Sequence, residues 1–151
     1  MRKYLILLFV VSLVWTLPVQ AENNMITKKS SHSVAVTLDR LEAALKEKEI
    51  AVVARVDHAA AAKKVDMALK PTQVLIFGNP KLGTPLMQSN PKIGLDLPLK
   101  VLAWEDAAGV VWVGYTAPTD LAARYQIGDR AEVVQKMTAV LDALTTQATK
   151  P

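Results

Sequence analysis

One histidine and two carboxylates are the groups best placed for proton-transfer chemistry. His58 directly follows Asp57, where an apolar run gives way to an alanine-rich one, and Asp96 lies further along in Leu95–Pro98. A helix N-terminus disfavours the imidazolium, so His58 would act there as a neutral acceptor or base. One hypothesis is therefore an enzyme with His58 and Asp96 as a general acid–base pair. The simpler alternative is a histidine that only bonds local backbone.

The sequence gives little support for a metal site, thiol catalysis or nucleotide binding. The chain has no cysteine, which excludes thiol catalysis and thiolate metal sites. The second histidine, His32, lies in a polar segment, so we predict no metal site and no cofactor. A glycine- and lysine-containing stretch, 78–84, lacks the contiguous Gly-Lys-Ser/Thr of a phosphate loop. Pro80 and Pro85 also remove two backbone donors, although the Lys81 ammonium could still bind an anion.

Ordered secondary structure must position these groups, and its pattern is mixed. Apolar and β-branched runs predict strands at 34–36, 50–57, 73–77, 100–105 and 110–115, the last two joined as a hairpin by Asp106–Gly109. Helices are predicted after the cap Thr37, over 58–69, over 118–124 and from the capping box Asp129/Glu132 through Leu144. Strand alternation places Trp112 opposite to Tyr115. The fold class is α+β: a curved sheet with helices packed on one face.

The segment 78–98 (GNPKLGTPLMQSNPKIGLDLP) stands out because it is long and rich in turn residues. A structureless connection of this length inside a compact domain is unusual. Pro85 favours a helical turn nearby, and the Asn-Pro and Leu-Pro steps set rigid bends. We predict an ordered flange here, and expect the functional site beside it.

The first 21 residues have the layout of a secretory signal peptide. Arg2 and Lys3 precede an uncharged apolar run, and Val19-Gln20-Ala21 supplies a cleavage site. The alternative, a membrane anchor, needs about 20 apolar residues, whereas Pro18 and Gln20 interrupt this run. We predict cleavage after Ala21, a periplasmic or secreted protein, and no membrane span after cleavage. The mature chain is predicted as a tether over 22–33, a single domain over 34–144 and a disordered tail over 145–151.

Charge gives no indication of nucleic acid as a partner. Cleavage removes Arg2 and Lys3, so the formal net charge falls from +4 to +2. The remaining basic residues are interspersed with Asp and Glu rather than gathered in a stripe.

Several motifs together resemble the domain-of-unknown-function family 302. They are VDHAAAAKKV, QVLIFGNPKLGTPLMQ, GLDLPLKVLAWED and VWVGYTAP, within a similarity that spans residues 34–144. The resemblance implies a compact α+β domain with a topology similar to the TATA-binding-protein-like class, often associating as a dimer. It implies no reaction. The residues most typical of the family are His58, Gly78, Asn79, Pro80, Thr84, Leu86, Met87, Asp96, Leu97, Pro98, Trp104 and Tyr115.

Three functional hypotheses follow. The first is a non-enzymatic module that binds a small molecule or a partner; the second is the acid–base enzyme; the third is a structural homodimer. The predicted ligand-binding residues are His58, Asn79, Lys81, Thr84, Asp96, Trp104 and Tyr115. For the homodimer, the predicted interface centres on Leu86 and Met87, with Leu82, Ile93 and Leu95 beside them.

Overall fold

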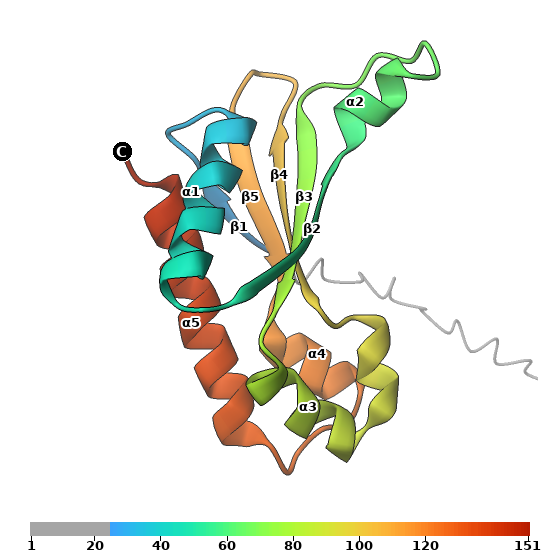
Figure 1. The fold of residues 1–151 in the computed structure, drawn as a ribbon, viewed down its shortest axis with the longest axis vertical. Coiled ribbons are helices and arrows are strands. Elements are labelled where there is room, and N and C mark those ends of the chain that lie inside the picture. Colours follow the sequence, from blue (N-terminus) through green and yellow to red (C-terminus); the bar gives the residue numbers. More distant parts are fainter. Residues whose placement is uncertain (1–24) are drawn as a thin grey trace, which may run out of the picture.

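Five strands form one antiparallel sheet in the order β1-β5-β4-β3-β2 (Figure 1). The computed structural model describes residues 25–151, so the predicted signal peptide lies outside the described residues. The strands are β1 (Met25–Lys29), β2 (Ala51–Asp57), β3 (Thr72–Gly78), β4 (Leu99–Glu105) and β5 (Val111–Thr116). The predicted β4–β5 hairpin is confirmed: the Asp106 carboxylate accepts the N–H groups of Ala108 and Val110, and Gly109 has a φ of 80°.

Two helices, α1 (Val34–Glu47) and α5 (Ala131–Thr149), cover one face of the sheet (Figure 1). Alternate residues of the three central strands point toward them, as the period of two requires. The resulting main core joins both helices to the sheet. Its members include Leu38, Leu41, Leu45, Leu75, Phe77, Val101, Ala103, Val113, Tyr115, Leu141 and Leu144.

A second apolar cluster lies beyond the end of the sheet, around the N-terminal half of α5. It is built with three short elements: α3 (Pro80–Ser89), the 3-10 helix η1 (Pro91–Leu95) and α4 (Pro118–Arg124). Its buried members are Leu86, Ile93, Leu121, Ala122, Ile127, Val134 and Met137. The remaining helix, α2 (His58–Lys63), stands apart at the opposite end (Figure 1). The predicted α+β fold with one domain is confirmed.

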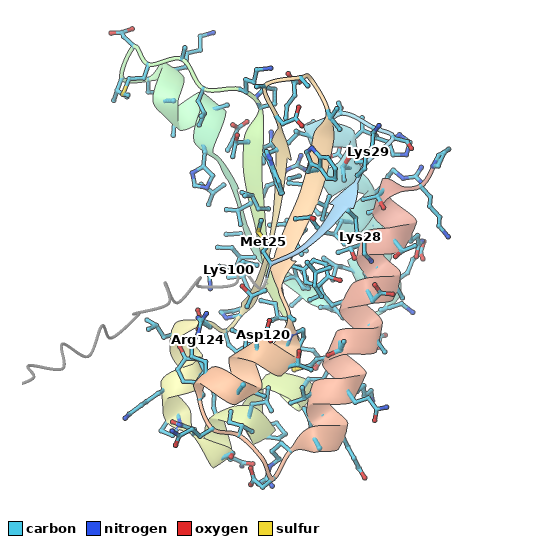
Figure 2. All side chains as sticks on the ribbon, turned by 180° about the vertical axis from the view of Figure 1, so that it is seen from behind. Met25, Lys28, Lys29, Lys100, Asp120 and Arg124 are labelled. Carbon is cyan, nitrogen blue, oxygen red and sulfur yellow. The ribbon has the colours of Figure 1, made fainter. Side chains whose placement is uncertain are left out.

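The second face of the sheet carries no described helix across it (Figure 2). Trp104 and Trp112 are paired there across β4 and β5. The Trp112 indole N–H donates to the Asp106 carboxylate over 2.8 Å. Gly114 lies beneath the Trp104 ring, because a Cβ added at Gly114 would come within 2.9 Å of that ring. Trp104 therefore shields part of this face.

Two predictions for the first part of the domain are wrong. Residues 34–36 begin α1 rather than a strand, because the Ser33 side chain accepts the Val36 N–H and caps the helix. The predicted tether contains β1, whose five residues pair with β5. Lys28 joins this strand to α5 through a 2.8 Å ion pair with Asp142. The order of elements therefore starts with β1.

The helical ends also differ from prediction. The predicted tail is the last part of α5, where Thr145 and Thr149 are buried and donate their hydroxyls to the carbonyls of Leu141 and Thr145. Helix α2 stops at Lys63 rather than at residue 69. The predicted capping box is absent from the described start of α5, which has no side-chain cap; the Asp129 carboxylate accepts the Ser89 hydroxyl instead.

We expect Gly114→Ala to destabilise the fold. The added Cβ would approach Trp104 within 2.9 Å, and a rigid indole must then move, at a cost of roughly 1–3 kcal/mol. Denaturant unfolding of the two proteins measures this loss. Gly128→Ala is the matched control, because a Cβ at Gly128 meets no described atom within 4 Å. Equal stability of the two variants would contradict the packing of Trp104 on Gly114.

Candidate functional site

An apolar cavity of about 390 Å³ lies where the main core meets the second cluster. This volume is in the lower part of the range for small-molecule sites, about 300–1,000 Å³. Its walls come from the start of β2, the end of β3, α3, the turn into β4, and α5. The lining residues are Ile50, Ala51, Val53, Phe77, Gly78, Asn79, Pro80, Leu82, Gly83, Thr84, Met87, Leu97, Pro98, Leu99, Met137, Val140, Leu141 and Leu144.

The cavity has a buried floor and an exposed mouth. Phe77, Leu141 and Leu144 form the floor and are buried. Val53 and Met87 lie at the mouth and are exposed, Val53 by 62%. Among the lining residues of the described chain, only Asn79 and Thr84 have polar side chains, and none is charged. Such a site favours an uncharged, mainly apolar molecule.

Helix α3 forms the outer wall of the cavity, and its own sequence determines where the helix starts. The Asn79 side chain accepts the Lys81 N–H over 2.9 Å, and Pro80 occupies the first turn, where its missing N–H costs nothing. Gly83 adds no side chain, and an added Cβ there would reach Leu97 at 3.7 Å. Much of the predicted long connection is therefore helical.

A polar cluster outside the cavity fixes this wall to α4. The Asp96 carboxylate accepts hydrogen bonds from the Tyr125 hydroxyl, at 2.7 Å, and the Arg124 guanidinium, at 2.9 Å. Asn90 donates its side-chain N–H to the Tyr125 carbonyl over 2.8 Å. The Tyr125 hydrogen bond, then the Arg124 contacts, hold the pKa of the Asp96 carboxyl below its ordinary value. Asp96 thus serves as an anchor for the segment before β4.

The structure brings two of the seven predicted ligand-binding residues into this cavity, namely Asn79 and Thr84. Lys81 is exposed on α3 outside the lining. Tyr115 is buried in the main core, and Trp104 lies on the opposite face of the sheet. Sequence reasoning missed the walls from β2 and α5, because their aliphatic residues carry only the pattern of an ordinary core.

His58 and Asp96 lie at opposite ends of the sheet. His58 follows Asp57, which pairs with Gln73 at the start of β3. Asp96 precedes Leu99, which pairs with Phe77 near the end of β3. Four strand residues at about 3.3 Å each separate these ends by roughly 13 Å. The predicted acid–base pair is therefore not formed, and His58 is an exposed residue at the start of α2.

The predicted interface residues do not form one exposed surface. Leu86 and Ile93 are buried in the second cluster, so they cannot present an apolar surface to a partner. Met87 is exposed at the cavity mouth, and Leu95 is 84% exposed. Leu86 is therefore a core residue, and the homodimer hypothesis loses one of the two residues on which its predicted interface was centred.

The profile of the family described as "Domain of unknown function DUF302" matches residues 26–144. The chain belongs to the DUF302 family. A DUF302 protein from Bacillus stearothermophilus has a similar fold, with a TM-score of 0.75 over 83% of this chain and 98% of that one, at 20% identity. This likeness concerns the fold alone.

Two curated relatives are described as "Fluoride-specific ion channel FluC 1", from Brucella suis biovar 1 (strain 1330) and Brucella abortus biovar 1 (strain 9-941). Each is 45% identical over 115 residues, which is 76% of this chain. The match covers 45% and 43% of those proteins, so this chain spans less than half of their length. Within residues 25–151, no helix is long and apolar enough to cross a membrane.

We expect Asp96→Asn to lower stability most at neutral pH. Because the folded pKa is depressed, the charged carboxylate stabilises the fold above the unfolded value of about 3.9, and this contribution is lost as pH falls through the folded pKa. Hydrogen bonds to a charged group contribute roughly 1–3 kcal/mol. Urea unfolding at pH 7 and pH 3 should show a gap between the proteins that narrows at the lower pH. A gap independent of pH would contradict this role of the charge.

Proposed function

We propose that this DUF302 domain binds a small, uncharged or largely apolar molecule in the cavity beside α3. The observation that carries the proposal is the lining itself: about 390 Å³ bounded almost entirely by aliphatic and aromatic groups. Water in such a space gains few hydrogen bonds, so an apolar ligand that replaces it is favoured. Asn79 and Thr84 provide neutral polar contacts near the start of α3, where they would orient one end of the ligand.

The geometry supports binding better than catalysis. Among the residues that the structure describes, the cavity is lined by no histidine, carboxylate, lysine or serine that could transfer a proton or attack a substrate. The fluoride channel in the names of the Brucella relatives also gives no support for anion binding in this cavity, since its lining residues within 25–151 include no charged group. We therefore propose a binding module rather than an ion pathway or an enzyme.

A ligand of this class should stabilise the purified protein. Straight-chain alcohols and fatty-acid amides of increasing length are suitable uncharged probes in a thermal-shift series, with native mass spectrometry to detect any co-purified molecule. A ligand at about 100 times its Kd adds roughly 2.7 kcal/mol to the free energy of unfolding. Absence of any saturable stabilisation and of any bound molecule would refute the proposal.

A cavity-filling variant tests the location of binding. Gly83→Phe would direct its ring toward Leu97, and its Cβ makes an ordinary 3.7 Å contact, so we expect a folded protein that no longer responds to the probes. Gly128→Phe is the matched control, because that position lies outside the lining. If Gly83→Phe binds the probes as the parent does, the ligand occupies another site.

We further propose that the protein acts in the periplasm or outside the cell, on the basis of its first 21 residues. Expression of the full chain followed by cell fractionation and intact-mass measurement tests this. We expect a mature polypeptide that begins at Glu22 in the exported fraction. A polypeptide that keeps Met1 and stays in the cytoplasm would contradict the proposal.

A further inference from the structure

The segment between β2 and β3, residues 58–71, projects from the molecule as an arm (Figure 1). No residue of α2 is buried within the described structure. Beyond α2, Val65, Met67 and Leu69 expose about half or more of their surface, Met67 as much as 67%. Exposed aliphatic side chains are unfavourable in water, and covering them is favourable. The arm therefore presents an apolar tip that the described chain itself does not cover.

The turn at this tip is held by backbone hydrogen bonds. The Asp66 N–H donates to the Lys63 carbonyl over 3.2 Å, and the Met67 N–H donates to the Ala62 carbonyl over 3.0 Å. Asp66 has a φ of 57°, in the left-handed region. Two such bonds around one left-handed residue are the Schellman arrangement that ends many helices. The positions of Val65 and Met67 are therefore fixed by the end of α2, although both side chains are exposed.

Lysines accompany the apolar tip. The arm contains three lysines and one aspartate, a formal net charge of +2 with its histidine neutral. Lys70 is held at the base by Glu105 over 3.1 Å. Lys63 and Lys64 are exposed and form no ion pair within residues 25–151. Cationic and apolar groups share one side of the arm, around a shallow hollow lined by Ala59, Ala60, Lys63, Met67, Ala68, Leu69 and Lys70.

This combination fits a lipid surface better than a protein partner. The arm has no aromatic side chain, whereas the centres of protein–protein interfaces are enriched in aromatic residues and depleted in lysine. Its 14 residues are also fewer than the roughly 20–30 that each side of a stable protein interface contains. A bilayer accepts a small projecting tip, because aliphatic side chains enter the boundary of the acyl chains while ammonium groups stay among anionic headgroups.

We propose that the tip of the arm, residues 63–69, docks on an anionic lipid surface. Val65, Met67 and Leu69 enter the boundary between headgroups and acyl chains, and Lys63 and Lys64 stay beside the headgroup phosphates. The arm begins after Asp57 at one end of β2, whereas the cavity lies beside the other end of this strand. Docking therefore does not depend on the ligand proposed for the cavity.

Vesicle flotation tests the docking. The chain from Glu22 onward is used, because it contains every described strand, helix and core residue and lacks the apolar N-terminal run. We expect it to bind vesicles of phosphatidylcholine and phosphatidylglycerol in equal parts, and to bind phosphatidylcholine alone far less. Failure to bind the anionic vesicles would overturn the proposal.

Replacement of one apolar side chain at the tip tests its insertion. Met67→Asp should lower the partition coefficient roughly tenfold or more, because a charge replaces a buried thioether. Met67 is exposed in the free protein, so the melting curve should stay unchanged. Leu95→Asp is the matched control, since Leu95 is also exposed but lies in η1, and it should bind as the parent does. A Met67→Asp protein with the partition coefficient of the parent would contradict insertion of the tip.

The two exposed lysines of the arm are tested together. Lys63→Gln with Lys64→Gln should weaken binding to anionic vesicles by about fivefold for each lysine, and should reduce its dependence on salt. Lys46→Gln with Lys48→Gln is the matched control, because these exposed lysines lie at the end of α1, near the start of β2. Equal losses in the two double variants would mean that overall charge binds the vesicles, and the arm would not be the docking site.

A label on the arm distinguishes a lipid from a protein occupant. The chain has no cysteine, so Met67→Cys accepts a single environment-sensitive fluorophore. Its emission should shift to shorter wavelength only when anionic vesicles are added. The same label at Val36→Cys, exposed on α1, should not shift. A shift that appears on raising the protein concentration without vesicles would mean that another chain covers the arm, and the lipid proposal would then be wrong.

Discussion

The length of α5 is the constraint on which the rest of this structure depends. Its 19 residues extend about 28 Å, whereas a seven-residue strand extends about 23 Å, so the helix overhangs the sheet. Leu141, Leu144 and Ala148 pack on the sheet, but Val134 and Met137 lie on the overhang and require separate cover. That cover comes from α3, η1 and α4. The cavity is the space between the two clusters that α5 joins.

Polar contacts around the outside hold this space in shape. Asp96 connects the end of η1 to Arg124 and Tyr125, and the Ser89 hydroxyl donates to the Asp129 carboxylate. The Arg130 guanidinium also donates to the Pro85 carbonyl. These bonds fix α3 relative to α4 and α5 without filling the interior. A site of this kind is preformed, which lowers the cost of ordering it when a ligand binds.

Sequence reasoning recovered what periodicity encodes directly: four of the five strands, the hairpin at Asp106–Gly109, α4 and the apolar stripe of α5. It missed β1, because MITKK has no strand alternation and is held by pairing with β5 and by Lys28. It ended α5 early, because threonines resemble a polar tail although their hydroxyls bond the helix carbonyls. The long segment was correctly expected to be ordered. A site was also expected beside this segment, and the segment does line the cavity. The walls from β2 and α5 were not predictable, since they are distant aliphatic residues with no chemical signature.

The two faces and two edges of the sheet differ in how much of them is covered by other parts of the chain. One face is covered by helices, and on the other Trp104 shields Gly114. At one edge of the sheet, β2 pairs with β3 alone in the described structure, and Val53 of this edge strand also lies at the mouth of the cavity. The mouth is therefore bounded on that side by an edge strand, whereas the floor is held by buried residues of both the sheet and α5. A molecule that enters the cavity thus meets the least constrained part of its wall first.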